Sequence, residues 1–153
     1  MASIEKSETI TIEPMHWSDA FSIGYPLIDK HHKKLFSITE KLHKLIYAPC
    51  TDKRQQKIAN IAVALRNYAI YHFSAEENIL KKNKCELYFE HKQEHDIFIQ
   101  TVERLFPKLI GGDLPAQKEV YEFLVNWLVH HICESDKRWA DRIHLGKNTD
   151  SPS

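Results

Sequence analysis

The segment HKQEH places His91 and His95 four residues apart, on what the surrounding apolar period predicts to be the buried face of a helix. Side chains at i and i+4 lie on one helical face, one turn apart, so the two imidazoles can point at the same place. Burying imidazole without a partner is costly. The spacing therefore predicts a shared partner for the two rings, and neutral imidazole is the commonest metal ligand.

The other long apolar segments carry interruptions of the same kind. Residues of the types that ligate metals recur in them: His31, His32, His72, Glu76, His131 and Asp136. In the first helix, periodicity alone permits either His31 or His32. In the fourth, His130 and Glu134 form an alternative i,i+4 pair, whereas Asp136 follows His131 by five residues.

The number of these polar interruptions favours a metal centre. Each buried polar group without a partner costs roughly 1–3 kcal/mol, and the whole stability of a domain is only about 5–15 kcal/mol. Mutual hydrogen bonding of the imidazoles and carboxylates is an alternative, but a shared metal satisfies all of them. Five imidazoles and two carboxylates are too many donors for one tetrahedral zinc ion. They suit iron or manganese, and a helix-bundle core is a known place for a two-metal cluster.

A rival motif overlaps the same segment. HKQEH also satisfies H-x-x-E-H, the pattern of a class of zinc proteases. A match of five residues is weak on its own, and this interpretation leaves His72, Glu76, His131 and Asp136 without a role.

Four helical segments must position these residues. Apolar residues recur at spacings of three and four over residues 26–47, 52–81, 86–110 and 115–143, and breakers such as APCTD, KKNKC and GGDLP separate the segments. Short connections between amphipathic helices predict an all-α fold, an up-down-up-down antiparallel four-helix bundle. We expect Trp17, Phe21 and Tyr25 to pack an N-terminal arm against it. The expected domains are a tail at 1–14, the bundle at 15–145 and a C-terminal tail at 146–153.

Composition narrows the class of protein further. The 153 residues carry 21 basic and 21 acidic side chains, and a formal net charge of zero disfavours nucleic acid as a partner. No apolar run approaches the length of a membrane span, and the N-terminus has no apolar signal-peptide core. Cys50, Cys85 and Cys133 form no CxxC pair. We expect a reduced, cytoplasmic protein.

The complete pattern resembles the hemerythrin family, most closely the single-domain bacteriohemerythrins. The resemblance covers nearly the whole chain, from MHWSDAFSIGYPLIDKHHKKLF at residue 15 to about residue 140. Its motifs are IDKHHK on the first helix, HFSAE on the second, HKQEH on the third and HICESD on the fourth. All four stand in the order and spacing of the family pattern.

The family pattern decides between the open alternatives. It selects His32 over His31, and it selects His131 with Asp136 in the fourth helix. We therefore expect His31 and His130 to be flanking or exposed residues. The implied metal ligands are His32, His72, Glu76, His91, His95, His131 and Asp136. The implied cofactor is a pair of iron ions joined by an oxo or hydroxo bridge.

The resemblance also implies how two irons share the ligands. His91, His95 and His131 bind one iron, His32 and His72 bind the other, and Glu76 and Asp136 bridge the two. If both ions are six-coordinate, these ligands and the oxo or hydroxo bridge fill every position except one. That open position lies on the iron with two histidines, where a small diatomic molecule can bind.

We therefore expect a protein that binds dioxygen reversibly, as a carrier, store or delivery protein, and that could serve a protein acceptor of oxygen. Leu35, Phe73, Trp127 and Ile132 stand beside the ligands or within a turn of them, and we expect them to wall the open site with apolar surface that excludes water. An enzyme would need proton donors there, and none is evident. The alternatives are a di-iron enzyme that reduces peroxide or nitric oxide, and an oxygen or redox sensor.

Overall fold

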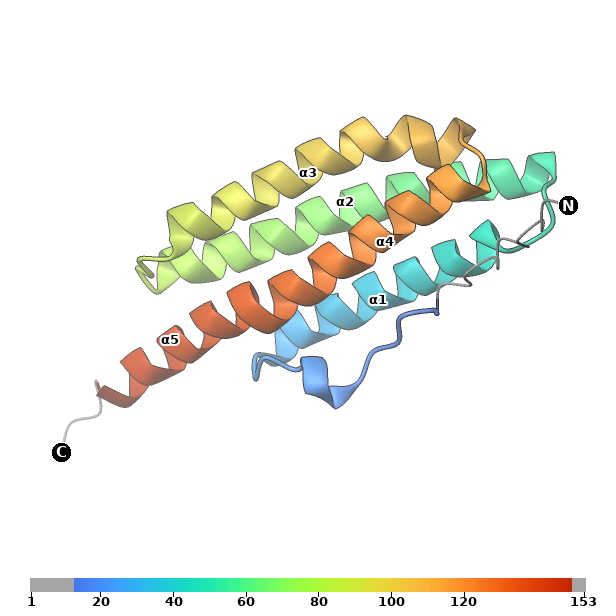
Figure 1. Cartoon of the computed structure of the whole chain (residues 1–153). Coiled ribbons are helices and arrows are strands. Elements are labelled where there is room, and N and C mark those ends of the chain that lie inside the picture. The colour runs from blue at the N-terminus through green and yellow to red at the C-terminus, as the bar shows by residue number, and fades with distance from the viewer. Residues whose placement is uncertain (1–12, 150–153) are drawn as a thin grey trace, which may run out of the picture.

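The computed structural model describes residues 13–149, and long helices dominate them. In Figure 1 the helices run alternately up and down, and α1 contacts α2 and α4 while α3 contacts the same two. This arrangement confirms the predicted antiparallel four-helix bundle. The elements are η1 (Asp19–Phe21), α1 (Pro26–Ile46), α2 (Asp52–Lys82), α3 (Tyr88–Gly111), α4 (Leu114–His130), η2 (His131–Asp136) and α5 (Lys137–Thr149).

The last rod of the bundle differs from the single helix predicted over residues 115–143. It is divided into α4 and α5 by η2, a six-residue π-helical segment. The three pieces follow one another in a continuous line in Figure 1. The helical segment also continues to Thr149, past the domain boundary expected at residue 145. The outer parts of both expected tails, residues 1–12 and 150–153, lie outside the described residues.

Local sequence explains where the helices begin. Pro26 occupies the first turn of α1, where its missing N–H costs nothing. The Thr51 side chain caps α2 by accepting a hydrogen bond from the Arg54 backbone N–H at 3.2 Å. At the turn into α4, a Cβ on Gly112 would lie 2.0 Å from the Lys108 carbonyl oxygen, so only glycine fits there.

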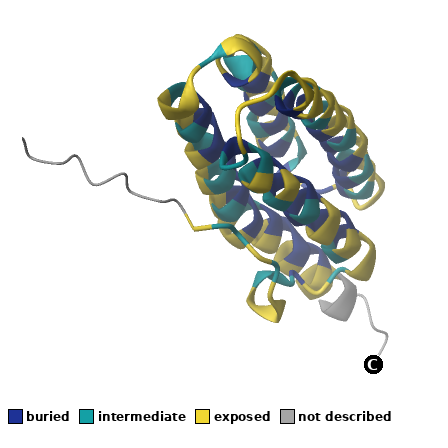
Figure 2. Cartoon of the chain, turned by 90° about the vertical axis from the view of Figure 1, so that its right-hand side faces the viewer, coloured by how far each residue is buried: buried dark blue, intermediate teal, exposed yellow. Residues whose placement is uncertain are grey.

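The core follows the predicted faces, with one displacement in α2. The buried residues of α2 are Arg54, Ile58, Ala62, Leu65, Ala69, His72, Phe73, Glu76 and Leu80. The larger Ile61, Tyr68 and Ile79, which also follow the spacing of three and four, are only half-buried. In Figure 2 the buried residues line the inner faces of the helices. Small Ala62 and Ala69 lie at the centre of the inner face of α2, where a neighbouring helix can approach closely.

The N-terminal arm packs against the bundle through aromatic contacts, as predicted. Trp17 and Phe21 lie against Phe36 of α1, with ring centroids 5.5 and 4.8 Å apart respectively. Tyr25 contacts Trp139 of α5 at 5.7 Å. The arm therefore ties the start of α1 to α5.

A buried arginine closes the end of the bundle away from the histidines. Arg54 donates hydrogen bonds to the Leu45 and Ile46 carbonyl oxygens at 2.7 and 2.9 Å, and to Gln117 Oε1 at 2.7 Å. Gln117 Nε2 in turn donates to the Leu109 carbonyl at 3.0 Å. This relay satisfies the C-terminal carbonyls of α1 and reaches α3, and the negative end of the α1 dipole stabilises the guanidinium charge.

Candidate metal centre

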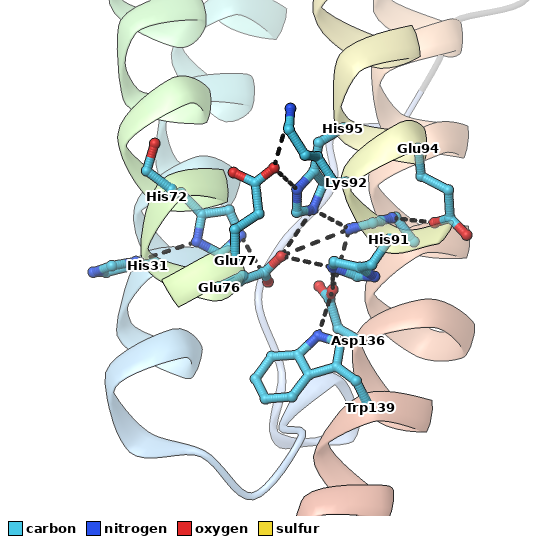
Figure 3. Close-up of polar contacts among 12 residues, drawn as sticks. His31, His72, Glu76, Glu77, His91, Lys92, Glu94, His95, Asp136 and Trp139 are labelled. Carbon is cyan, nitrogen blue, oxygen red and sulfur yellow. Dashed lines mark hydrogen bonds and ion pairs between the residues drawn. The ribbon is translucent and has the colours of Figure 1, made fainter. Parts of the chain in front are cut away.

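The seven predicted ligands converge inside the bundle from four elements. The structure brings all of them together, and each is at most 3% exposed. In Figure 3, Glu76 lies between the labelled histidines of α2 and α3, with Asp136 beside them. The contributing residues are His32 of α1, His72 and Glu76 of α2, His91 and His95 of α3, and His131 and Asp136 of η2.

Three histidines gather around one oxygen of each carboxylate. His91 Nε2 and His95 Nε2 lie 3.0 and 2.9 Å from Glu76 Oε2. His131 Nε2 lies 3.1 Å from His95 Nε2 and 3.1 Å from Asp136 Oδ1. We call His91, His95 and His131 the three-histidine set.

Two histidines face the other oxygen of each carboxylate. His72 Nε2 lies 3.1 Å from Glu76 Oε1, and His32 Nε2 lies 3.0 Å from Asp136 Oδ2. His32 Nε2 is also 3.4 Å from Glu76 Oε1. We call His32 and His72 the two-histidine set. Glu76 and Asp136 thus each turn one oxygen towards each set, which is the arrangement of a carboxylate that bridges two metal ions.

The two halves of the chain divide the ligands between them. The α1–α2 hairpin supplies the two-histidine set, and the α3–η2 half supplies the three-histidine set. Glu76 comes from the first half and reaches the three-histidine set, whereas Asp136 comes from the second half and reaches His32. Each half therefore completes the ligand set of the other.

The geometry fits two metal ions better than a network of hydrogen bonds. Among the residues that the structure describes, His32 Nε2, Glu76 Oε1 and Asp136 Oδ2 are buried without a hydrogen-bond partner, although they lie close to one another. Two donors at right angles, each about 2.1 Å from one ion, lie roughly 3 Å apart. The contacts of 2.9–3.1 Å within the sets match that spacing. Two ions would satisfy the unpartnered atoms.

Protons occupy part of this centre when no metal is bound. Burial opposes charge on the histidines, but close contacts with the Asp136 and Glu76 carboxylates raise the pKa of His32 and of His91 to about 9. The pKa of Asp136 is lowered, because the nearby His131 charge and the close contacts with His131 and His32 outweigh burial and the Glu76 charge. Metal binding must therefore displace protons.

Several ligands have a second partner that fixes their orientation. His131 Nδ1 lies 2.9 Å from Glu94 Oε2, and Trp139 Nε1 donates to Asp136 Oδ1 at 3.2 Å. His72 Nδ1 lies 3.2 Å from His31 Nδ1. Sequence reasoning missed all three partners. The spacing of Trp139, three residues after Asp136, was the one visible sign of its role.

His31, His130 and Glu134, the alternatives to the selected ligands, do not join the cluster. His130 and Glu134 pair at 3.3 Å and are both 68% exposed, so the expectation of an exposed His130 is confirmed. His31 is a flanking residue and not an exposed one, because it is 4% exposed and lies against the ligand His72. Burial, with His72 and His32 nearby, lowers the pKa of His31. Glu94, the acid of the protease-like motif, bonds the outer nitrogen of His131 and does not join the cluster.

An apolar cavity lies about one helical turn from the ligands of both histidine sets. Its volume is about 10 Å³, roughly the space of one water-sized sphere. Phe73 stacks on His95 at 3.9 Å and Trp127 stacks on His131 at 4.3 Å. Of the four predicted pocket residues, Leu35, Phe73 and Trp127 line the cavity, whereas Ile132 is fully buried outside its lining. The residues that sequence reasoning missed are Thr39, Leu65, Ala69, Phe98, Leu124 and Leu128.

The fold and the site together define a four-helix-bundle protein with a buried centre for two metal ions. Residues 23–143 match the family model described as "Hemerythrin HHE cation binding domain". The chain therefore belongs to the hemerythrin family, whose members bind oxygen at non-haem iron. No helix within residues 13–149 is long and apolar enough to cross a membrane.

Individual relatives agree with this assignment. The chain is 38% identical to a bacteriohemerythrin of Clostridium acetobutylicum over 82% of this chain and 98% of the relative. It is 31% identical to a bacteriohemerythrin of Methylococcus capsulatus over 82% and 94%. A crystal structure of wild-type hemerythrin superposes with a TM-score of 0.72 at 27% identity, covering 84% of this chain and 97% of the other.

Proposed function

We propose that this protein holds two iron ions joined by an oxo or hydroxo bridge, and that it binds dioxygen reversibly at one of them. The observation that carries the proposal is the division of Glu76 and Asp136 oxygens between three histidines on one side and two on the other. When bound, the iron pair supplies two electrons and one open coordination position. His32 and His72, with Glu76 and Asp136, would hold the ion that has this open position.

The protein residues have separate tasks in this proposal. The five histidines and Glu76 and Asp136 hold the ions at fixed positions, and the carboxylates set the separation of the two. Glu94 and Trp139 hold His131 and Asp136 in the required orientation. Because His131 and Asp136 are held by these outer partners, their side of the site needs little reorganisation when it takes up or releases a ligand.

The walls near the site favour reversible binding over further reaction. Leu35, Phe73 and Trp127 line an apolar cavity, and the hydroxyl of Thr39 in the same wall is occupied, since it donates to the Phe36 carbonyl at 2.7 Å. Such walls exclude water and offer no free proton donor. We therefore propose a carrier, store or delivery protein and not an enzyme. We also propose a reducing, cytoplasmic setting, which suits three free cysteines.

Two alternatives use the same centre. An enzyme that reduces peroxide or nitric oxide would turn over and leave the iron ferric. A sensor would pass the state of the iron to another protein. A delivery protein would instead pass dioxygen to a protein acceptor. Repeated gas exchange separates carriage from turnover.

The test begins with the iron-loaded protein reduced under argon. Dioxygen is added and then removed by argon, and the visible charge-transfer absorption is followed over many cycles. Colour that appears and fades reversibly supports dioxygen carriage. Conversion to a stable ferric form in the first cycles, with consumption of added peroxide, would overturn it in favour of an enzyme.

A further inference from the structure

His31 is a buried titratable residue for which the proposed function has no use. It is 4% exposed, it precedes the ligand His32 in α1, and its Nδ1 lies 3.2 Å from Nδ1 of the ligand His72 in α2. Figure 3 shows the two rings meeting across the α1–α2 interface, with His31 on the side of His72 away from Glu76. The contact therefore engages the nitrogen of His72 that does not face the metal centre.

The direction of this hydrogen bond follows from the metal centre. His72 turns Nε2 towards Glu76 Oε1 at 3.1 Å, so Nε2 is the atom that offers a lone pair to an ion. The proton of neutral His72 must then reside on Nδ1, and His72 donates it to His31. His31 Nδ1 is the acceptor, and its own proton lies on Nε2.

The neighbouring rings keep His31 in position to accept this bond. The ring centroids of Tyr68, one turn before His72 on α2, and of Tyr71, which directly precedes His72, lie 6.0 and 5.2 Å from the His31 ring centroid. The His31 and His72 rings are nearly perpendicular, at 77°, with centroids 5.3 Å apart. The His31 ring is therefore held in place by its contacts with Tyr68, Tyr71 and the His72 ring.

We propose that His31 is a positioning residue, which fixes the ring orientation and the tautomer of His72 and so retains the metal ion of the two-histidine set. The proposal rests on the proposed function, because it assumes that an ion occupies that set. A ligand histidine whose outer N–H is bonded is a stronger donor and is fixed in one ring orientation. Losing such an outer partner typically lowers metal affinity about 10–100-fold.

The three-histidine set and the two-histidine set differ in the group that accepts the outer N–H of a ligand histidine. His131 of the three-histidine set donates to the carboxylate of Glu94, whereas His72 donates to a neutral imidazole. The bond to a carboxylate is charge-assisted and stronger. His31 is therefore the lesser of the two anchors, and its removal should release one ion and not both.

Two substitutions separate hydrogen bonding from packing. His31→Phe keeps a ring against Tyr68 and Tyr71 but has no acceptor, whereas His31→Gln keeps an acceptor oxygen without the ring. His130→Phe and His130→Gln are matched controls, because His130 also precedes a ligand but is 68% exposed. Should His31→Phe not fold, His31→Leu removes the acceptor with a smaller side chain.

Metal release to a chelator is measured on each iron-loaded protein, together with the imidazole N–H proton signals of the zinc-loaded protein. We expect His31→Phe to lose one of its two ions at least about tenfold faster than the wild type, and to lose the slowly exchanging N–H signal of His72. His31→Gln should stay within about twofold of the wild type, and the second ion should be unaffected in both. The same order is expected for His31→Leu.

The opposite order would overturn the proposal. If His31→Phe retains both ions as the wild type does, or if His31→Gln loses metal as fast as His31→Phe, then His31 serves packing alone. These outcomes are distinct from a failure of the proposed function, in which wild-type protein would hold its two ions without binding dioxygen reversibly, or would not bind two ions.

Discussion

His131 and Asp136 are five residues apart, yet His131 Nε2 lies 3.1 Å from Asp136 Oδ1. In a regular α-helix, residues five apart point about 140° away from each other. The π-helical η2 closes i→i+5 turns, so the two side chains lie one above the other. The five-residue spacing of His131 and Asp136 therefore requires the π-helical hydrogen bonding of η2.

Moving the carboxylate by one residue tests this relationship. We expect Asp136→Ala to lose bound metal, and we expect Ser135→Asp in the same chain not to restore it. The reason is that η2 directs position 136 towards the cluster, although position 135 would be the i+4 partner of His131 in an α-helix. Metal content after gel filtration measures the effect. Recovery of two ions per chain in the double variant would show that the π turn is dispensable.

The metal-free protein should lose stability as the pH rises from about 6.5 to 9. The pKa of His32 and of His91 is about 9 in the folded protein, against an ordinary value of 6.5. Below pH 6.5 both folded and unfolded states bind these protons, and their stabilising contribution is complete. It is lost as the pH rises through 9. Thermal unfolding followed by circular dichroism at several pH values measures the trend.

Metal binding should show the opposite dependence in the same range. An ion needs neutral imidazoles, so metal affinity should increase between pH 6.5 and 9 while the stability of the metal-free protein decreases. Replacing His32 by glutamine should flatten both trends. If the melting temperature of the metal-free protein is constant between pH 6.5 and 9, the raised pKa of His32 and of His91 is contradicted.

Arg54 should contribute to stability without affecting metal content. We expect Arg54→Leu to lower the free energy of unfolding by about 3 kcal/mol, because the Leu45 and Ile46 carbonyls and Gln117 Oε1 lose their donor. Urea unfolding of the metal-loaded protein gives the value. The control is Arg66→Leu on the same helix. Its exposed pair with Glu103 at 2.8 Å should be worth at most about 1 kcal/mol.

The apolar wall should protect the iron from oxidation. Leu35→Thr and Leu35→Val create side chains of nearly equal shape that differ in a hydroxyl against a methyl group. We expect the threonine variant to convert to the ferric form several-fold faster, because the hydroxyl admits water and can donate a proton. The rate of loss of the oxygenated spectrum measures it. Equal rates in the two variants would mean that cavity size, and not dryness, governs oxidation.

The helices and the i,i+4 ligand pairs could be predicted from local spacing, whereas His32, His131 and Asp136 were selected by the resemblance to the family pattern. The pairs His72 with Glu76 and His91 with His95 are i,i+4, and apolar periodicity marks their faces. The π-helical segment could not be predicted in this way, because the hydropathy pattern does not show to which carbonyl each backbone N–H donates its hydrogen bond. The five-residue step to Asp136 was its only trace in the sequence.

His31 shows a different limit. Adjacent helical residues point about 100° apart, so one of two neighbouring histidines is expected to face outwards. α1 packs against both α2 and α4, however, and its buried face is wide enough to contain His31 and His32 together. The width of a buried face depends on how many neighbours a helix has, and that is settled only when the bundle is assembled.

The exchange of carboxylates between the two halves bears on how the molecule is made. Neither hairpin can assemble a complete coordination sphere until the other has docked, because Glu76 and Asp136 each belong to one half and serve both. Loading with two iron ions would therefore indicate that the α1–α2 half and the α3–η2 half have already docked. A metal pair bound as proposed would thus stabilise the assembled bundle and would not start its assembly.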